Sequence, residues 1–469
     1  MGGRGSGACG DLVELESGGD GWVAHLFPSR TQKLSTHTPK VLGWRRPGRL
    51  GSCRFDKAFA FADAFFISIA AGGKYMLSEK MIELGTKKST IRTIFEFGQK
   101  RIRDVGKENV FDFSLGNPSV PAPDFIKQAI KEILDEVDPL AIHGYTVAPG
   151  APEVRAALAT SISRRFGVKV SEKNLFLTAG AAAALTITFK AMGEAGDEFL
   201  TFAPFFPEYQ CFVESVGAKL VVVPARVEDF QIDFDAFLHA LTPKTKAVIV
   251  NSPNNPSGVV YSLDTVHRLT DILREKEKEY GHPIFLISDE PYREIVYDGV
   301  EVPYFAKFYA NTIICYSYSK SFSLPGERIG YILVPDEIVD FPYVYGAIAG
   351  AARVLTHVNA PSLFQRVIAR CADKTPDLSV YEKNGALLYQ GLLKAGFSCV
   401  KPQGAFYLFP KALEPDDYAF CERAKKYDLL LVPGTDFGCP GHFRAAYCVD
   451  TDMIVRSLSV FAELANAYR

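Results

Sequence analysis

The sequence predicts an α/β fold in which a mostly parallel sheet is sandwiched between helices. Short apolar runs alternate with stretches of helical periodicity after Pro118, which is typical of βα units. A chain of 469 residues with 48% hydrophobic side chains can also bury a large core and form two or three domains. Polar and small residues follow several of the apolar runs, and ligands bind at the carboxyl ends of parallel strands.

Six apolar runs are the candidate strands of this sheet. Each is short, apolar and followed by a turn or a helical pattern, as expected for a buried strand. The candidates are Leu175–Thr178, Glu198–Phe202, Lys219–Val223, Ala247–Asn251, Ile284–Ser288 and Thr312–Tyr316. Because the carboxyl ends of parallel strands meet at one edge, the residues that follow these runs are the candidates for a functional site.

Residues 1–75 differ from the rest of the chain. They are rich in Gly, Arg and Ser, as in GGRGSGACG and GWRRPGRLGSCR, and show no sustained period of 3.6 or 2. We interpret them as a non-native or disordered N-terminal extension, because strong helix formers begin abruptly at Met76. A start-site error explains the change, since Gly72-Gly73-Lys74 can be encoded by GGAGGAAA, which resembles a ribosome-binding site. The alternatives are a genuine disordered extension and a transit peptide, which the early acidic residues disfavour.

Charge and cysteine usage exclude several classes of protein. The net charge of -2, from 52 basic and 54 acidic residues, gives no field that would recruit nucleic acid or an anionic membrane. Nine cysteines without a CxxC pair or a zinc-like cluster predict neither a disulfide framework nor a structural metal site. The longest apolar stretch, residues 58–73, is interrupted by Asp63 and is too short to span a membrane. A cytoplasmic protein with a small-molecule partner is therefore expected.

Two of the predicted strand ends carry groups suited to a charged ligand. The run Leu175–Thr178 leads into AGAAAALTITFKAM, where the free amides of a helix start either bind a phosphate or simply pack closely. The run Ile284–Ser288 is followed by Asp289, which places a carboxylate at the end of a buried strand. Such a carboxylate needs a cation, for example a protonated ring nitrogen, unless it only caps the next helix.

A lysine follows the last strand candidate, Thr312–Tyr316, in the segment SYSKSFSLPGERIG. A lysine amine that is desolvated and close to another cation loses its proton easily and becomes able to form an imine. Arg328, shortly after Lys320, adds a forked cation suited to a phosphate. Taken alone, Lys320 reads equally well as a solvated surface residue, so the neighbouring segments decide its interpretation.

Together and in this order, these segments resemble the class I/II aminotransferases, which are pyridoxal-5′-phosphate (PLP) enzymes of fold type I. The resemblance runs from about Phe111 to the C-terminus and rests on SxSK followed by GxRxG. It implies a largely seven-stranded, PLP-binding large domain at residues 118–348 and a smaller α+β domain at residues 349–469. Residues 76–117 would form an N-terminal arm and a segment of the small domain. The implied activity is amino-acid:2-oxo-acid transamination of the aspartate and aromatic class by a ping-pong mechanism.

The resemblance implies cofactor roles for residues in several segments. Lys320 would hold PLP as a Schiff base and later move the proton between substrate and cofactor, while Asp289 would keep the ring nitrogen protonated. Tyr292 and Asn255 would bind the phenolic oxygen of the ring, and Phe206 would stack on the ring face. The implied phosphate ligands are the backbone of Ala181 and Ala182, Ser317, Arg328 and Tyr145 of the partner subunit. Many relatives have Ser or Thr at the position of Ala182, so this chain would offer one phosphate ligand fewer.

The same resemblance identifies residues for the substrate. Arg444, in GHFRAAY, would bind the α-carboxylate by a bidentate pair, and Gly116, in FSLGNPSVP, would line the same pocket. Arg353, in GAARVLTHVNAP, is either a ligand for a second carboxylate across the dimer or an ordinary solvated side chain. A homodimer with shared active sites, acting on an amino acid and a 2-oxo acid, is therefore implied.

Two other kinds of function remain open at this point. The same fold and the same lysine serve C–S lyases, decarboxylases and racemases, so the reaction type depends on more than the cofactor residues. A transcription regulator with an aminotransferase-like domain is a remote alternative. It would need a DNA-binding module, and residues 1–75 contain RRPGR but no pair of helical patterns typical of a helix-turn-helix.

Overall fold

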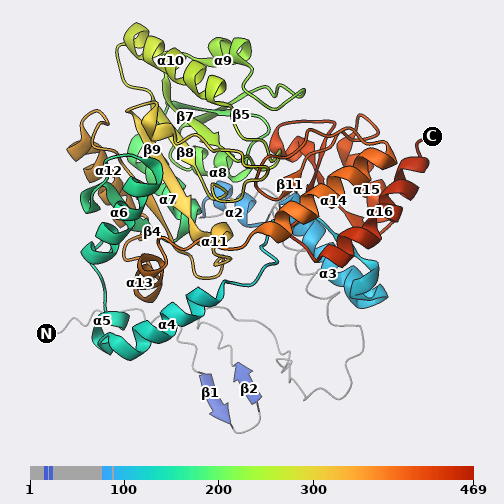
Figure 1. Ribbon diagram of the computed structural model, residues 1–469, viewed down its shortest axis with the longest axis horizontal. Helices are drawn as coiled ribbons and strands as arrows, with labels where there is room; N and C mark the ends of the chain where they lie inside the picture. Colours follow the sequence, from blue (N-terminus) through green and yellow to red (C-terminus); the bar gives the residue numbers. More distant parts are fainter. Residues whose placement is uncertain (1–14, 19–20, 25–76, 87–88) are drawn as a thin grey trace, which may run out of the picture. The chain divides into compact units, whose positions relative to one another are not determined.

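The computed structural model describes residues 15–18, 21–24, 77–86 and 89–469 (Figure 1). The chain divides into two compact units, Met1–Thr86 and Lys87–Arg469. All of the elements described below, apart from those of the next paragraph, belong to the second unit.

The first unit contains three described elements. Strand β1 (Leu15–Gly18) pairs antiparallel with β2 (Gly21–Ala24), and helix α2 (Glu79–Thr86) has no buried residue. The sequence predicted no strand in residues 1–75, because runs of four residues are too short to show a period. The rest of the predicted N-terminal extension lies outside the described residues, and translation from Met76 stays a prediction.

The second unit is built around a seven-stranded sheet with the order β4-β10-β9-β8-β7-β5-β6. Strand β10 is antiparallel to both of its neighbours, and every other pair in the sheet is parallel. The strands are β4 (Leu175–Thr178), β5 (Glu198–Phe202), β6 (Lys219–Val223), β7 (Thr245–Asn251), β8 (Phe285–Asp289), β9 (Thr312–Ser317) and β10 (Gly330–Leu333). The predicted α/β fold with a mostly parallel, seven-stranded sheet is therefore confirmed.

The sheet differs from the six predicted strands in the limits of β7, β8 and β9 and in the additional strand β10. Strand β8 extends to Asp289, because the backbone of that residue still pairs with Asn251 and Cys315 on the two flanking strands. Strand β10 was not among the six runs, since it starts two residues after Arg328, in a segment that the sequence analysis interpreted as a ligand loop. Polar residues at the end of a strand therefore make its limits difficult to predict from the sequence.

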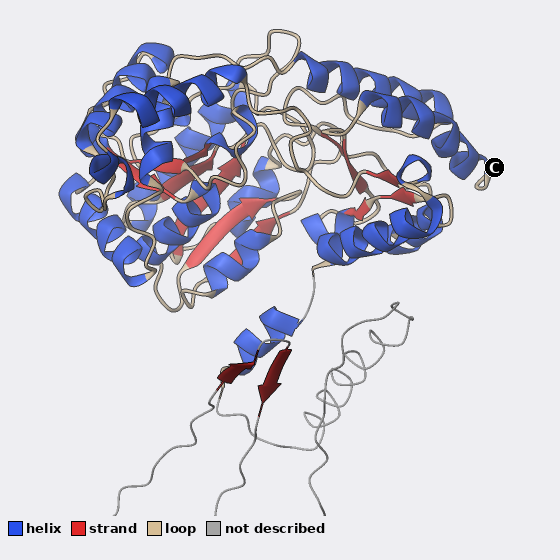
Figure 2. Ribbon diagram, turned by 90° about the horizontal axis from the view of Figure 1, so that it is seen from below, coloured by secondary structure: helices blue, strands red, loops and turns tan. Residues whose placement is uncertain are grey.

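Helices cover both faces of the sheet (Figure 2). Alternate strand residues point to opposite faces; Ile313 packs with the helices of one face, for example, and Ile314 with those of the other. One face is covered by α7 (Gly180–Met192), α8 (Glu208–Glu214) and α12 (Phe341–Val354). The other is covered by α4 (Asp124–Glu136), α5 (Pro139–His143), α6 (Pro152–Phe166), α9 (Phe234–Ala240), α10 (Leu263–Tyr280) and α13 (Ser362–Arg370). No helix in the described ranges has the length and apolar character needed to cross a membrane.

The antiparallel direction of β10 shapes the edge of the sheet where the site lies. Strand β9 ends at Ser317 and is followed at once by the short helix α11 (Tyr318–Ser321). The chain then turns back, and Gly330 at the start of β10 pairs with Ser317. No long crossover is needed, because antiparallel neighbours can be joined by a short connection. Residues on both sides of this turn therefore lie at the same sheet edge.

The C-terminal part of the unit is an α+β assembly of short strands and long helices. A three-stranded sheet has the order β11-β14-β13, and β12 pairs parallel with β3 from the N-terminal side. The strands are β3 (Phe111–Asp112), β11 (Tyr407–Leu408), β12 (Leu429–Leu430), β13 (Val432–Pro433) and β14 (Phe443–Ala446). The helices are α3 (Thr90–Val105), α14 (Ser379–Ala395), α15 (Asp417–Lys425) and α16 (Thr451–Asn466). The predicted boundary at residue 348 falls inside α12, and the domain limits stay a prediction.

Candidate active site

A cavity of about 310 Å³ lies where the carboxyl ends of β7, β8 and β9 face the short strands β11 and β14. Its lining residues are Ile91, Gly116, Ala181, Ala182, Leu185, Phe206, Asn251, Asn255, Asp289, Pro291, Tyr292, Ser317, Ser319, Lys320, Pro325, Arg328, Tyr407 and Arg444. Every site residue predicted from the sequence is among them except Tyr145 and Arg353. The chain thus brings together segments that are more than 300 residues apart, from Gly116 to Arg444.

Lys320 lies on α11, one turn beyond the end of β9, and points into the cavity. Its Nζ donates a hydrogen bond of 2.6 Å to the carbonyl of Gly116. The pKa of Lys320 is lowered to about 8, mainly because the amine is buried; Cys448 opposes the shift, and the charges of Arg444 and Arg328 add to it. The amine therefore loses its proton more easily than an ordinary lysine, as a nucleophilic lysine requires.

Asp289, the last residue of β8, presents a buried carboxylate to the cavity. Its Oδ2 accepts a hydrogen bond of 2.6 Å from the hydroxyl of Tyr209. Its Oδ1 is buried and has no hydrogen-bond partner within the described residues. Burial raises the pKa of Asp289 to about 7, the Tyr209 hydrogen bond opposes that rise, and the nearby Glu290 adds to it. An unpaired buried carboxylate oxygen of this kind calls for a cationic partner from a ligand.

The start of α7 and Arg328 form a cationic corner of the cavity. Gly180 begins the helix with φ +81, and a Cβ at that position would lie 3.1 Å from Nη2 of Arg328. The guanidinium of Arg328 donates to the carbonyls of Pro325 (3.1 Å) and Ala179 (3.3 Å). The amides at the helix start have no partner inside the helix, and together with a guanidinium they suit a phosphate.

Arg444 lies on β14 at the opposite end of the cavity and is 3% exposed. Its Nη1 donates to Oδ1 of Asn255 (3.2 Å) and its Nη2 to the carbonyl of Ser114 (2.5 Å). The guanidinium carbon lies 4.8 Å from the ring centre of Tyr407 and 4.9 Å from that of Phe437. Its Nε is buried and lacks a partner in the described part of the chain, so this arginine retains a free donor for an anion.

Two tyrosines of the site were not predicted from the sequence. The hydroxyl of Tyr407 lies 2.8 Å from that of Tyr292, and a Cβ at Gly116 would lie 1.9 Å from the Tyr407 hydroxyl. Tyr209 donates the hydrogen bond to Asp289 that is described above. Tyr407 belongs to a strand of two residues, which shows no period, and Tyr209 follows Phe206 by three residues. The three-residue spacing from Phe206 was the one feature of the sequence that could have pointed to Tyr209.

Tyr145 and Arg353 do not reach the cavity of their own chain. Tyr145 is 97% exposed, and Arg353 is exposed near the end of α12. The segments that carry them are neighbours, because the amide of Asn359 donates to the carbonyl of Ala148 (3.3 Å). The chain segments that follow Tyr145 and Arg353 therefore meet at Ala148 and Asn359.

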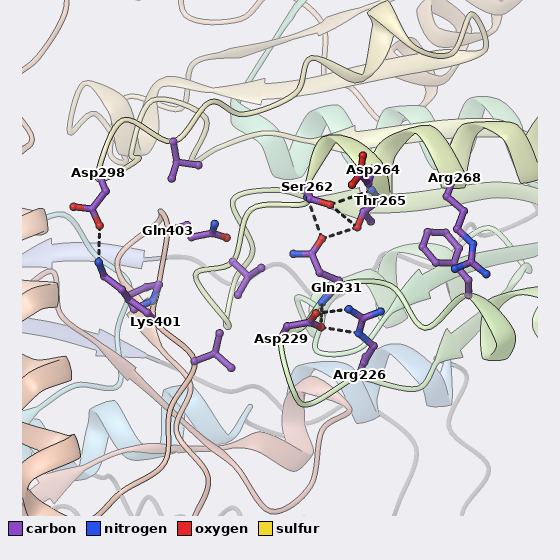
Figure 3. Close-up of a pocket in the computed structure, with 15 residues that line it drawn as sticks. Arg226, Asp229, Gln231, Ser262, Asp264, Thr265, Arg268, Asp298, Lys401 and Gln403 are labelled. Atoms are coloured by element: carbon purple, nitrogen blue, oxygen red, sulfur yellow. Dashed lines mark hydrogen bonds and ion pairs between the residues drawn. The ribbon is translucent and has the colours of Figure 1, made fainter.

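A larger cavity of about 760 Å³ lies elsewhere and shares no lining residue with the site (Figure 3). Its charged groups are largely paired with one another, as Figure 3 shows for Arg226 with Asp229 and for Lys401 with Asp298. Its polar side chains are also paired, since Gln231 accepts from Thr265 at 2.7 Å. The smaller cavity holds the lysine, the unpaired carboxylate and the partly free arginine, so we place the chemistry there.

The comparisons with known proteins agree with this arrangement. The family described as aminotransferase class I and II matches residues 108–461. The aspartate/prephenate aminotransferase of Thermus thermophilus is 30% identical over 364 residues, which cover 75% of this chain and 90% of the relative. The aspartate aminotransferase of Pyrococcus horikoshii is 26% identical over 402 residues, covering 82% of this chain and 96% of the relative.

Solved structures give the same result. An aminotransferase of Eubacterium rectale is 53% identical and superposes with a TM-score of 0.83, covering 84% of this chain and 100% of that chain. The aspartate aminotransferase of Thermus thermophilus, in a structure with maleate, is 27% identical with a TM-score of 0.71 and coverages of 83% and 100%. The resemblance found in the sequence is confirmed: the chain belongs to the class I and II aminotransferases and is a PLP-dependent aminotransferase.

Proposed function

We propose that this enzyme transfers the amino group of neutral, largely apolar or aromatic amino acids to a 2-oxo acid. The observation that carries the proposal is the distribution of charge around the 310 Å³ cavity. The cations among its described lining residues are Lys320, Arg328 and Arg444. Each of these has a task that any substrate requires, so the lining supplies no further cation for a charged substrate side chain.

Lys320 is proposed as the residue that binds the cofactor covalently and moves the proton. When bound, PLP supplies an aldehyde that condenses with amines and a ring that withdraws electrons from the substrate α-carbon. The lowered pKa of Lys320, about 8, and the carbonyl of Gly116 keep a reactive amine inside the cavity. Once substrate has displaced it, the same amine carries a proton between the substrate α-carbon and C4′ of the cofactor.

We assign the groups beside Lys320 to the cofactor ring. The unpartnered Oδ1 of Asp289 fits a protonated ring nitrogen, which would satisfy that buried oxygen. Tyr292 and Asn255 line the same cavity and are assigned to the phenolic oxygen of the ring. Phe206, on the chain segment that enters α8, is assigned to the face of the ring.

The cationic corner is assigned to the phosphate of the cofactor. The backbone amides of Ala181 and Ala182 belong to the first turn of α7, and Ser317 and Arg328 line the same cavity. Neither alanine has a hydroxyl to add, so the phosphate depends on backbone amides and on the guanidinium.

Arg444 is proposed as the ligand of the substrate α-carboxylate. Its free Nε and its position between two aromatic rings leave the guanidinium fixed in place with one donor unused. Asn255 accepts from the same guanidinium and so fixes its orientation. Gly116 lines the same cavity, and its lack of a side chain leaves room for the hydroxyl of Tyr407.

The rest of the wall supports a neutral substrate side chain. Ile91, Leu185, Pro325 and the ring of Tyr407 contribute apolar surface to the cavity. Burying a charged side chain against such surface without a partner is costly, whereas an aliphatic or aromatic side chain gains about 25 cal/mol per Å² buried.

A second candidate is a dicarboxylate substrate bound by Arg353 of the partner subunit. Two observations favour it: Arg353 is exposed without an ion pair inside the described ranges, and its segment adjoins that of the exposed Tyr145. Helix α12 also exposes Tyr343 (80%) and Val354 (70%), an apolar surface suited to a homodimer. The structural neighbours cover both cases, since one Thermus thermophilus structure contains maleate and a tetra mutant contains tryptophan.

A panel of L-amino acids decides between the two substrate classes. Each donor is mixed with holoenzyme and the change in the visible absorption of the cofactor is followed, then repeated with Arg353→Ala and with Arg103→Ala, another exposed arginine, as control. The proposal expects kcat/KM to be at least about 30-fold higher for neutral donors than for aspartate or glutamate. A preference for the acidic donors that Arg353→Ala alone reduces by about 30- to 1,000-fold would establish the dicarboxylate class instead.

We also propose a homodimer with shared sites and a cytoplasmic location. The exposed apolar side chains of α12 and the exposed Tyr145 support the dimer. The location rests on the scattered cysteines and balanced charge of the sequence. Sedimentation equilibrium measures the assembly directly, and mixing Lys320→Ala with Tyr145→Phe subunits tests shared sites by partial recovery of activity.

A further inference from the structure

Tyr209 lies behind the wall of the active-site cavity. It belongs to α8, near the start of that helix, and is 1% exposed. It does not line the 310 Å³ cavity, but it contacts two residues that do, Asp289 and Phe206. The proposed chemistry assigns it no step of its own.

The contacts of Tyr209 are directional. Its hydroxyl donates to Oδ2 of Asp289 at 2.6 Å, and it is the one side-chain donor to that carboxylate among the described residues. Its ring meets the ring of Phe206 edge to face, with centroids 5.6 Å apart and an interplanar angle of 85°. The other carboxylate oxygen, Oδ1, is left without a partner. Two groups assigned to the cofactor ring therefore share one support.

We propose that Tyr209 is a positioning residue that orients Asp289 and Phe206 together toward the cofactor ring. The inference rests on the proposed roles of those two residues. By occupying Oδ2, the phenol fixes the rotation of the carboxylate about its Cβ–Cγ bond and leaves Oδ1 for the ring nitrogen. By donating a hydrogen bond it also favours the ionised carboxylate, so the shared proton stays on the ring nitrogen.

Removal of the hydroxyl alone separates this role from simple packing. Tyr209→Phe keeps the ring, and with it the contact to Phe206, but removes the donor to Asp289. The carboxylate then holds a proton more tightly and turns more freely, so the ring nitrogen is less protonated. Tyr309→Phe is the matched control: Tyr309 is 3% exposed and donates to the carbonyl of Ile284 at 2.7 Å, and in the described part of the chain no hydrogen bond joins it to a residue assigned to the cofactor.

The experiment compares wild type, Tyr209→Phe, Tyr309→Phe and Asp289→Ala. Three kinds of measurement are made: the Kd of PLP for the apoenzyme, the absorption maximum of the holoenzyme, and the steady-state kinetics (kcat and KM) for the amino donor. For Tyr209→Phe we expect a PLP affinity and a kcat that are each roughly 10- to 100-fold lower, with KM nearly unchanged. The absorption maximum should move in the direction found for Asp289→Ala. Tyr309→Phe should lower Tm without changing any of the three.

Each remaining outcome has a definite meaning. If Tyr209→Phe keeps the Kd, absorption maximum and kcat of wild type while Asp289→Ala changes them, the inference about Tyr209 is wrong and the role of Asp289 stands. If Asp289→Ala changes none of them, the proposed role of Asp289 is itself wrong. In the Asp289→Ala background, Tyr209→Phe should add less than about twofold to the loss of PLP affinity. A further tenfold loss there would overturn the coupling between the two residues.

Discussion

The cavity has a cofactor half and a substrate half, and the chain builds them in different ways. The cofactor half consists of Asp289, Lys320 and Arg328, which sit at the ends of adjacent strands of one large sheet. The substrate half consists of Arg444, Tyr407 and Gly116, which come from β14, β11 and the segment after β3. Both halves contain residues of backbone ladders, Asp289 in the seven-stranded sheet and Arg444 and Tyr407 in the three-stranded one. The halves therefore differ in the sheet that carries them, a large and mostly parallel one for the cofactor and a small antiparallel one for the substrate.

This difference indicates which measurement each half should control. The residues of the large sheet are assigned to the cofactor, so substitutions there should act on the affinity for PLP and on kcat. The residues of the small sheet are assigned to the substrate, so substitutions there should act first on substrate binding. The predictions below test this division.

The largest effect is expected at Lys320. Lys320→Ala should reduce turnover by roughly four orders of magnitude or more, because one amine performs both the covalent and the proton-transfer task. The protein should stay folded, since the side chain makes a single hydrogen bond to Gly116. Borohydride reduction of wild-type holoenzyme followed by peptide mapping checks the assignment. A pyridoxyl label on any other lysine would refute it.

The sharpest test of the division is a pair of substitutions, one in each half. Arg444→Ala should lower kcat/KM by about 30- to 1,000-fold, mostly through KM, and leave the Kd of PLP unchanged. Asp289→Ala should lower kcat and the affinity for PLP while leaving KM close to that of wild type. Steady-state kinetics and PLP titration measure both. If both variants change PLP affinity equally, the two halves are not independent.

A third prediction concerns the stability of the apoprotein. The pKa of Lys320 is lowered from 10.5 to about 8 in the folded state. The buried charge therefore lowers the free energy of unfolding below pH 8, and this destabilisation disappears as the pH rises from 8 toward 10.5. Lys320→Met should therefore raise the stability of the apoprotein at pH 7 by roughly 1 to 3 kcal/mol, with a smaller gain above pH 8. Urea unfolding at several pH values measures this. A gain that grows with pH would contradict the assigned cause.

Arg444→Met is the counterpart in the substrate half. It leaves Oδ1 of Asn255 and the carbonyl of Ser114 without their donor, so it should destabilise the protein by about 1 to 3 kcal/mol. The same urea titrations serve as the measurement. A higher free energy of unfolding for Lys320→Met and a lower one for Arg444→Met would support the division between the two halves. A change of the same sign in both variants would contradict it.

The smallest effect is expected outside both halves. A chain that starts at Met76 should match the full chain in kcat, KM and Tm to within about one degree, because residues 1–75 show no period able to form a packed face. Differential scanning calorimetry and steady-state kinetics of the two chains provide the comparison. Loss of several degrees in Tm on truncation would show that the N-terminal residues stabilise the fold.

The sequence predicted the cofactor half better than the substrate half. Strands β4, β5 and β6 were predicted with their exact limits, because each is a short, largely apolar run between turn signals. Asp289 and Lys320 could be found from the same runs, since each stands at the end of one. Their specific roles came from the resemblance and not from the runs.

The strands of the substrate half gave no comparable signal. Tyr407 lies in a strand of two residues, and a period cannot be read from two positions. Arg444 was identified only through its resemblance to the family, although β14 places it beside Tyr407 and Phe437. Tyr209 was missed because its importance depends on Asp289, which is far away in sequence and adjacent only after folding.

The backward turn into β10 has a consequence for how this catalytic unit can be inherited. Strand β10 runs antiparallel to β9 and starts opposite Ser317, so a short connection is enough to join the two strands. Both strands and their connection therefore lie within residues 312–333. That stretch carries the lysine, the serine and the phosphate arginine together. Recombination or grafting that exchanges residues 312–333 transfers all three in register, whereas a junction placed between Lys320 and Arg328 divides them. The residues of the substrate half can therefore be varied, in evolution or by design, while residues 312–333 are kept together as one segment.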